Sequence, residues 1–303
     1  MGSPGPLYSR LSRVKVSNPV LREALAEFIG VFILILFGCG SVAQVHLSRH
    51  SAGQTLGINF AFAFGVVMGA HLAWGVSGAH LNPAVSLSMS LLGRLPWRKL
   101  PVFCLAQFLG SFVAAATVYG LYYDALMAFN GGNLTVTGSG ATAAIFATYP
   151  SEHLSIAGGF FDQLLGTAAL LLCIMALLDS KNNAVPRGLE PLLIGLAVFG
   201  ISLSMAFNSG CAINPARDFG PRLFTAMAGY GSEVFTVGPH WWWVPIIAPL
   251  VGGPLGALCY ILFVDLHHIA PPELPPMALE PLVSDENHHS KGSYVAVKTG
   301  QQP

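Results

Sequence analysis

Six long apolar stretches dominate the pattern of hydrophobic and polar positions along the chain. They cover residues 28–45, 54–79, 100–123, 160–178, 191–216 and 234–264. Asp162, near the start of the fourth stretch, is the one Asp, Glu, Lys or Arg inside them. A helix needs roughly 20 mainly apolar residues to cross the ~30 Å hydrocarbon layer of a membrane. The pattern therefore predicts an all-α membrane protein with six transmembrane helices.

Two shorter apolar segments, 84–92 and 216–228, each begin with an Asn-Pro-Ala tripeptide. The tripeptides are Asn82-Pro83-Ala84 and Asn214-Pro215-Ala216. Asn is a favoured N-cap residue and Pro is favoured at the first helical position, so each tripeptide is expected to start a helix. About twelve residues at about 1.5 Å each span roughly 18 Å, little more than half of the hydrocarbon layer. Such half-helices begin near the midplane, where irregular backbone is tolerated only beside a cavity or within protein.

The two halves of the chain repeat one another. Both tripeptides follow Ser-Gly and three further residues, and residues 27–30 and 107–110 correspond to 163–166 and 249–252. Three helices and one half-helix are thus duplicated. Because each repeat holds an odd number of spans, the second repeat is expected to be inverted in the membrane.

This duplication defines the expected domain organisation. One membrane domain covers residues 21–266, with repeat one at about 21–125 and repeat two at about 158–266. The flanking segments, 1–20 and 267–303, read as polar tails. The second tail is rich in Pro and acidic residues and is expected to be disordered.

Lys and Arg are distributed unevenly between the two sides of the predicted domain. They gather in both tails and in the connections after the second and fourth spans, whereas the opposite loops carry only Arg49 outside the second half-helix. This bias places both termini in the cytoplasm. The loop 124–159 is then extracellular, and its Asn133-Leu134-Thr135 fits the pattern for N-glycosylation of Asn133.

Composition agrees with a membrane protein and excludes other classes. Charged residues make up 9% of the chain and apolar residues 53%, against about 25% charged residues in a typical soluble domain. A formal net charge of zero offers no basic patch for nucleic acid. The five cysteines lie in apolar segments, which does not suggest a disulfide framework.

Catalytic and metal-binding motifs are also missing from the sequence. It contains no serine-elbow, zinc-helix or phosphate-loop motif, so we expect neither enzyme activity nor a cofactor. The pairs His267-His268 and His288-His289 lack a third ligand at useful spacing, so no metal site is expected either.

The doubled Asn-Pro-Ala motif, with Arg217-Asp218 directly after the second copy, resembles the aquaporin or major intrinsic protein family. The Asp after the Arg resembles its aquaglyceroporin branch, and stretches 37–44, 145–150 and 218–224 resemble vertebrate members of that branch. The likeness covers roughly residues 21–267. It implies an aquaporin-like fold with six transmembrane helices and two half-helices in an inverted 3+3 repeat. It also implies a plasma-membrane homotetramer with four separate pores.

By the same resemblance, the chain is a passive channel for water, glycerol and other small neutral solutes such as urea, and it excludes ions and protons. The expected selectivity filter consists of Phe62, Ser202, Cys211 and Arg217. Water-selective members place a His where Ser202 stands, so the filter here should be wider. Phe62 would supply an apolar wall and Arg217 the hydrogen-bond donors, which suits a polyol. Asp218 is expected to rearrange the adjoining loop and widen the pore.

The half-helices themselves predict how a solute would pass. Two helix N-termini that meet at the midplane each carry roughly half a positive charge, which disfavours cations. Asn82 and Asn214 would offer amide donors to the solute. The non-helical lead-ins would offer backbone carbonyl acceptors, at Gly78, Ala79, His80, Gly210 and Ala212.

Several alternatives stay open from the sequence. Glu27 can brace the first lead-in by hydrogen bonds, as Gln163 can in the second repeat, or it can couple transport to protons. His80 can be structural or can sense pH. A water-selective aquaporin is one rival function. A coupled secondary transporter is another, and it would need a titratable or ion-binding residue at the midplane.

Overall fold

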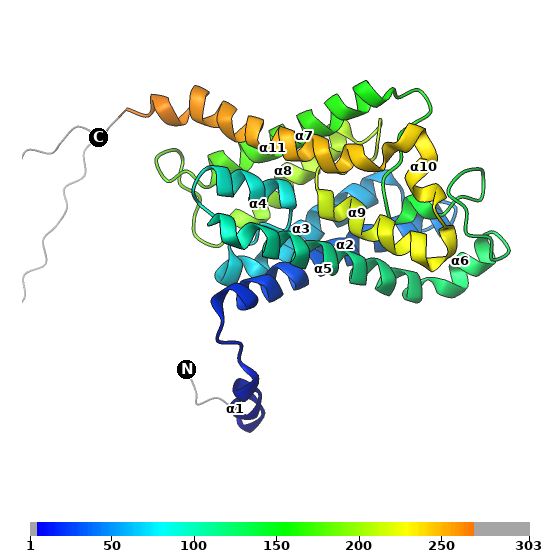
Figure 1. Cartoon of the computed structure of the whole chain (residues 1–303), viewed down its shortest axis with the longest axis horizontal. Coiled ribbons are helices and arrows are strands. Elements are labelled where there is room, and N and C mark those ends of the chain that lie inside the picture. The colour runs from blue at the N-terminus through cyan, green and yellow to red at the C-terminus, as the bar shows by residue number, and fades with distance from the viewer. Residues whose placement is uncertain (1–4, 270–303) are drawn as a thin grey trace, which may run out of the picture. The chain divides into compact units, whose positions relative to one another are not determined.

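The computed structural model describes residues 5–269, and within this range all regular secondary structure is helical (Figure 1). The α-helices are α1 (Pro6–Leu11), α2 (Pro19–Leu47), α3 (Thr55–Ser77), α4 (Pro83–Leu91), α5 (Leu100–Leu121), α6 (Tyr123–Phe129), α7 (Ile156–Leu177), α8 (Glu190–Met205), α9 (Pro215–Thr225), α10 (Glu233–His240) and α11 (Val244–Phe263). Shorter helical turns include η3 (Ala143–Ile145), the π-helical η4 (Ala226–Tyr230), η5 (Trp241–Trp243) and η6 (Asp265–His267).

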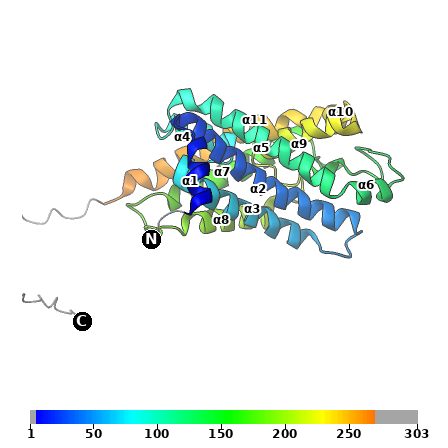
Figure 2. The ribbon, with the colours of Figure 1, turned by 90° about the horizontal axis from the view of Figure 1, so that it is seen from below.

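Six of the described helices form the apolar framework. By length and composition, five can cross a membrane, and these contain α2, α3, α5, α7 and α11. The sixth, α8, is apolar but has 16 residues, a length of about 24 Å. Figure 2 shows α2 and α3 side by side, and these two helices pack along each other.

The fifth apolar stretch, expected to run over 191–216, is helical only as far as Met205. The chain then leaves the helix, and Gly210 adopts a left-handed φ of 76° while its N–H still bonds the Ala206 carbonyl. An apolar pattern does not register this break, because the lead-in to the second half-helix is as apolar as the span before it.

Two other boundaries also differ from the sequence pattern. The first helix begins at Pro19 rather than near residue 28, because the Asn18 side chain caps it by accepting from the N–H groups of Val20 and Leu21. The last long helix begins at Val244 rather than near residue 234, since the backbone is non-helical from Val237 to Pro239. Of the predicted C-terminal tail, residues 270–303 lie outside the described residues.

Both predicted half-helices are present and start where the sequence places them. Asn82 caps α4 by accepting from the N–H of Ala84, and Asn214 caps α9 by accepting from Ala216 and Arg217. With nine and eleven residues, the two helices are about 14 Å and 17 Å long. Neither can cross a ~30 Å hydrocarbon layer by itself.

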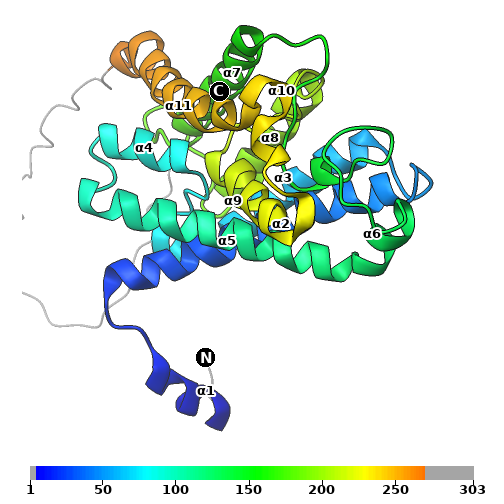
Figure 3. The ribbon, with the colours of Figure 1, turned by 45° about the vertical axis from the view of Figure 1, so that its right-hand side comes forward.

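Each half-helix packs on the last long helix of the other repeat. Helix α4 lies against α11, and α9 lies against α5, as Figure 3 shows for α9. Glycines permit both contacts, because a Cβ at Gly253 of α11 would meet Ser88, and one at Gly220 of α9 would meet Ser111. The two repeats therefore cross over and hold each other's half-helices.

The duplicated positions also make matching contacts between long helices. A Cβ at Gly110 of α5 would collide with the Phe28 carbonyl of α2. A Cβ at the equivalent Gly252 of α11 would collide with the Leu164 carbonyl of α7. Close approach of helix backbones through small residues is the usual packing mode of membrane helices. The internal repeat of the sequence is thus also a repeat of structural contacts.

Candidate functional site

A cavity of about 480 Å³ lies between the half-helices and the long helices. Its wall extends from Thr55, where α3 begins, to Arg94, beyond the end of α4. Eleven of the residues singled out from the sequence line it, namely Phe62, Gly78, Ala79, His80, Asn82, Ser202, Gly210, Cys211, Ala212, Asn214 and Arg217. The structure therefore brings the expected filter, both central Asn residues and both lead-ins to one space.

Other predicted residues lie away from the cavity surface. Pro83, Ala84, Pro215 and Ala216 are buried behind it and form the first turns of α4 and α9. Asp218 is fully buried and belongs to the framework described below. Asn133 is exposed in the connection between α6 and α7.

The two central Asn side chains bond reciprocally across the junction of the repeats. Asn82 Nδ2 donates to the Ile213 carbonyl at 2.9 Å, and Asn214 Nδ2 donates to the Leu81 carbonyl at 2.8 Å. Their Oδ1 atoms already cap α4 and α9, so both amide orientations are fixed. Since each amide nitrogen carries two hydrogens, one N–H per Asn remains for a ligand in the cavity.

Both lead-ins follow the same unusual backbone path. The residues with left-handed φ are Gly78 (83°), Ala79 (55°) and Leu81 (55°) before the first tripeptide, and Gly210 (76°), Cys211 (52°) and Ile213 (41°) before the second. A non-glycine residue in this region costs about 1–3 kcal/mol and persists only where its surroundings hold it. This path departs from the helix, and residues of both lead-ins line the cavity.

Glu27 holds the first lead-in in this conformation. Its Oε1 accepts from the N–H of His80 at 2.9 Å and from the Ser77 hydroxyl at 2.6 Å. Its Oε2 accepts from the N–H of Leu81 at 2.7 Å and from the Gln107 amide at 2.8 Å. Four donors thus satisfy this fully buried carboxylate.

Gln163 holds the second lead-in in the same way but without charge. Its Oε1 accepts from the N–H of Ile213 at 2.9 Å, and its Nε2 donates to the Ser209 hydroxyl at 2.6 Å. The neighbouring Asp162 accepts from that hydroxyl at 2.5 Å and from the Asn208 amide at 3.3 Å. The bracing expected for Glu27 and Gln163 is therefore seen in their contacts.

Arg217 and Phe62, two residues of the expected filter, face each other across 4.5 Å. The guanidinium carbon of Arg217 lies 4.5 Å from the centroid of the Phe62 ring, within cation–π range. Its Nη1 donates to the Phe146 carbonyl at 2.8 Å, which fixes the orientation of the guanidinium. Its other N–H groups remain available to a ligand in the cavity. Ser202 and Cys211, both small, line the same cavity.

Asp218 and Arg222 form a fully buried ion pair, with 2.8 Å between Nη2 and Oδ1. Asp218 also accepts from the backbone N–H of Thr148 at 2.7 Å and from its hydroxyl at 2.5 Å, and Arg222 donates to the Thr148 carbonyl. The Arg222 guanidinium lies 4.6 Å from the ring centroid of Tyr149. The pair thus fixes the connection between α6 and α7 in place beside Arg217.

The profile of the major intrinsic protein family matches residues 14–260. The chain belongs to this family. Aquaporin-9 of Rattus norvegicus is 53% identical over 264 residues, covering 87% of this chain and 90% of the relative. Aquaporin-10 of Homo sapiens is 49% identical over 263 residues, covering 87% of both chains. These matches confirm the family inferred from the doubled tripeptide.

A solved structure agrees with the fold. The crystal structure of the aquaglyceroporin from Plasmodium falciparum superposes with a TM-score of 0.73 at 32% identity, covering 80% of this chain and 95% of that one. The expected aquaporin-like fold of this major intrinsic protein is therefore confirmed.

The cavity of this major intrinsic protein is also lined by residues that were not singled out from the sequence, among them Leu81, Ile213, Ala147 and Thr148. Leu81 and Ile213 supply the carbonyls that receive the central amides, and Ala147 and Thr148 come from the connection between α6 and α7. The pairing of Leu81 with Ile213 could have been found by aligning the two lead-ins. The connection gives no such signal, because its position depends on contacts with Asp218 and Arg222.

His80 contacts both the lead-in and the half-helix of this family member. Its Nδ1 lies 3.1 Å from the Ser86 hydroxyl, and its ring meets Phe103 edge-on at 5.3 Å between centroids. Ser86 also accepts from the Gln107 amide at 3.0 Å, which in turn bonds Glu27. His80 thus belongs to a hydrogen-bonded network and lines the cavity as well.

Proposed function

We propose that this major intrinsic protein is a passive membrane channel for water, glycerol and small neutral solutes such as urea. The observation that carries the proposal is the reciprocal bonding of Asn82 and Asn214 beside a cavity that reaches from the start of α3 to beyond α4. The names of its relatives support this function, since they include aquaporins and an aquaglyceroporin.

A hydroxyl group in the cavity finds complementary partners along the wall. Carbonyl groups of the two lead-ins can accept a hydrogen bond from its O–H, and the remaining N–H of Asn82 or Asn214 can donate one to its oxygen. At the filter, the Phe62 ring offers a surface for carbon atoms while Arg217 donates to oxygen. A polyol, which is apolar on its carbons and polar on its oxygens, fits such a two-sided wall.

Ions find no comparable replacement for water. The positive ends of α4 and α9 meet at the two Asn caps, and Arg217 adds a full positive charge nearby. A cation is therefore repelled at the place where it would have to lose its hydration. The same field disfavours proton passage.

Swelling of proteoliposomes in glycerol, urea and sorbitol gradients, with current recorded in parallel, tests this function. We expect fast water and glycerol fluxes, a slower sorbitol flux and no current above that of empty liposomes. Asn214→Asp keeps the side-chain size but adds a carboxylate between the helix N-termini, so it should reduce exclusion of cations. Measurable current or counter-flow stimulation in the wild-type protein would overturn the channel mechanism.

Two rival functions fit the site less well. Water-selective members of the family place a His where Ser202 stands, whereas here the small side chains of Ser202 and Cys211 line the cavity. A proton-coupled transporter needs a carboxylate free to exchange protons, whereas backbone N–H groups occupy both oxygens of Glu27.

His80 supports a proposal of pH-dependent glycerol flux. It lines the cavity, and the charged groups facing it are Glu27, which accepts from its backbone N–H, and Glu23, which is paired with Lys99. A change of charge at the imidazole would disturb its contact with Ser86. His80→Ala should therefore flatten the pH profile of glycerol flux between pH 5 and 7.5, and an unchanged profile would exclude gating through this residue.

Assembly and membrane placement are also proposed here from sequence and family. We propose a plasma-membrane homotetramer with four independent pores, cytoplasmic termini and a glycan on Asn133. Asn133 is exposed, as a glycan requires. Native mass spectrometry in detergent tests the tetramer. A mobility shift on glycosidase treatment that is lost in Asn133→Gln tests both the glycan and the outward orientation of its loop.

A further inference from the structure

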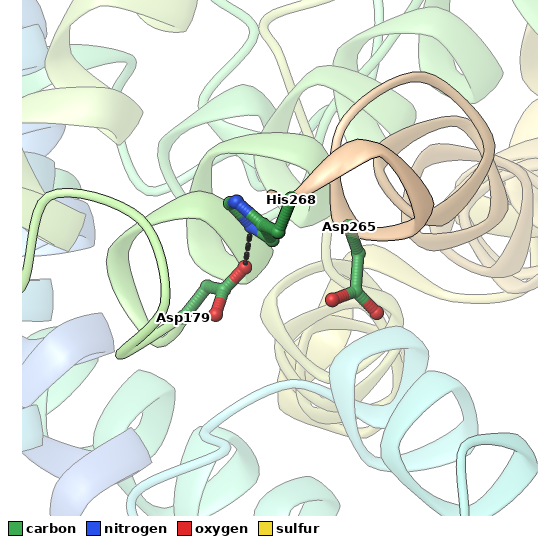
Figure 4. Close-up of side chains that lie close together, drawn as sticks. All are labelled: Asp179, Asp265 and His268. Atoms are coloured by element: carbon green, nitrogen blue, oxygen red, sulfur yellow. Dashed lines mark hydrogen bonds and ion pairs between the residues drawn. The ribbon is translucent and has the colours of Figure 1, made fainter. Parts of the chain in front are cut away.

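A second group of polar side chains lies at the end of the helical domain that contains Arg94 and Leu178. Asp179 follows the end of α7, and Asp265 and His268 lie in and beside η6, after α11 (Figure 4). Carboxylate oxygens of the two acids and a ring nitrogen of the histidine all lie within 4.8 Å of one another. Sequence spacing had suggested no third ligand for His268, because Asp179 is brought to it from a distant connection.

The first ligand, Asp179, is held in position by groups outside the cluster. Its Oδ1 accepts from the backbone N–H of Lys181 at 2.9 Å, and its Oδ2 accepts from the Tyr260 hydroxyl at 2.9 Å. Asp179 is therefore a carboxylate held in a fixed orientation, as outer hydrogen bonds provide for metal ligands.

The remaining two ligands are more accessible. Side-chain exposure is 21% for His268 and 32% for Asp265. His268 Nε2 lies 2.8 Å from Asp179 Oδ2, and Asp265 Oδ1 lies 3.2 Å from Lys181 Nζ. The Lys181 side chain is 66% exposed and can swing into solvent, which would release Asp265.

The chemistry of the three donors selects the ion. One imidazole nitrogen and two carboxylates match the ligand types of Zn²⁺ sites with an open fourth position. At bond lengths of about 2.0–2.1 Å, tetrahedral ligand atoms stand about 3.4 Å apart. The present separations, from 2.8 Å to no more than 4.8 Å, bracket that value, so small rotations of the two half-buried side chains of Asp265 and His268 suffice.

We propose that Asp179, Asp265 and His268 bind one Zn²⁺ ion per chain, with water in the fourth position. The ion replaces the Lys181 ammonium as the partner of Asp265. It ties the connection after α7 to the turn after α11. Leu178, next to Asp179, lines the cavity, so the metal would sit beside one mouth of the passage.

Zinc titration of the purified full-length chain against a fluorescent competing chelator tests the site. The background should carry His288→Gln and His289→Gln, so that these tail histidines do not add to the stoichiometry. We expect one Zn²⁺ per chain. His268→Gln and Asp265→Asn should each weaken binding by at least about tenfold, since even outer-shell partners are worth 10–100-fold in affinity.

Two further variants distinguish a metal site from a set of ion pairs that only joins the two segments. His267→Gln is the matched control, because His267 is exposed and bonds the Leu262 carbonyl outside the cluster, so zinc affinity should not change. Lys181→Ala removes the cation that competes for Asp265 and should tighten zinc binding. If the cluster only joined the two segments through ion pairs, the same change would weaken it. Unsaturable binding, or equal losses in the His267 and His268 variants, would overturn the proposal. Unchanged glycerol flux of the variants verifies that they are folded.

Discussion

At the scale of single residues, the position of the Phe62 ring depends on Gly38, a glycine that does not line the cavity. A Cβ at Gly38 of α2 would overlap the ring of Phe62. The ring can therefore lie back against α2 and face Arg217 only because position 38 has no side chain. The small residues Ser202 and Cys211 line the same cavity.

Gly38→Ala should push the Phe62 ring toward the cavity. Because glycerol is wider than water, we expect glycerol flux to fall severalfold and water flux to fall less, measured by stopped-flow light scattering. Gly40→Ala is the matched control on the same helix, since a Cβ there meets no atom within 4 Å. Equal glycerol fluxes in the two variants would show that the Phe62 ring can avoid the added methyl group without moving into the cavity.

Cys211 gives a chemical handle on the same wall. It lines the cavity, whereas Cys39, Cys104, Cys173 and Cys259 do not. A mercurial reagent should therefore block glycerol flux in the wild type, and Cys211→Ser should abolish most of that block. Cys173→Ser serves as the control and should remain sensitive. Persistent inhibition of the Cys211 variant would place the reactive thiol elsewhere.

At the scale of elements, a short helix in a membrane needs partners that long helices do not. The start of α9 is fixed by its Asn cap, but its middle carries the buried pair Asp218–Arg222. That pair reaches out of the helix to Thr148, so one element positions both itself and the neighbouring connection. The expected loop rearrangement by Asp218 has this physical basis, while a wider pore remains a proposal.

Asp218→Asn should destabilise the protein strongly. Removing one partner of a buried ion pair leaves an uncompensated charge and costs about 3–5 kcal/mol. We expect a lower denaturation midpoint in detergent, with part of the loss restored by adding Arg222→Met. Asp265→Asn is the control, because its partner Lys181 is 66% exposed and such surface pairs contribute about 0–1 kcal/mol. Similar midpoints for the two single variants would contradict a structural role for the buried pair.

At the scale of the whole molecule, the crossed packing of half-helices makes the two repeats interdependent. Helix α4 belongs to repeat one in sequence but lies on α11 of repeat two, and α9 lies on α5. Reciprocal bonds from Asn82 and Asn214 add a second connection between the repeats. Neither repeat alone contains the complete packing surface for its own half-helix.

Splitting the chain between the repeats tests this dependence. A fragment of residues 1–150 alone lacks α11, on which α4 packs. A Cys introduced at Ser88 of this fragment should therefore react with a water-soluble maleimide. Co-expression with residues 151–303 should protect that Cys and restore glycerol flux. Ser88→Cys in the intact chain is the control and should be protected. Protection in the isolated fragment would mean that α4 finds its place within its own repeat.

How much the sequence predicted depends on how local each interaction is. Asn82 and Asn214 start their helices through contacts with the next few residues, so the half-helices were predicted correctly. The end of α8 at Met205 was missed, since the lead-in that follows is equally apolar. The contacts of Phe146 and Thr148 were missed as well, because they join segments about 70 residues apart that share no sequence periodicity.

The reciprocal bonds at the midplane set a limit on how many oxygen atoms can be served there at once. The side-chain amide of each central Asn donates one hydrogen to a backbone carbonyl of the opposite lead-in, and its oxygen caps a half-helix. Only one amide hydrogen of Asn82 and one of Asn214 therefore remain for a solute. The hydroxyl groups of a three-carbon and of a five-carbon alcohol must therefore pass this point in turn, and each one can form the same hydrogen bonds with the two amides. Discrimination by chain length has to arise outside this point, where Phe62 faces Arg217.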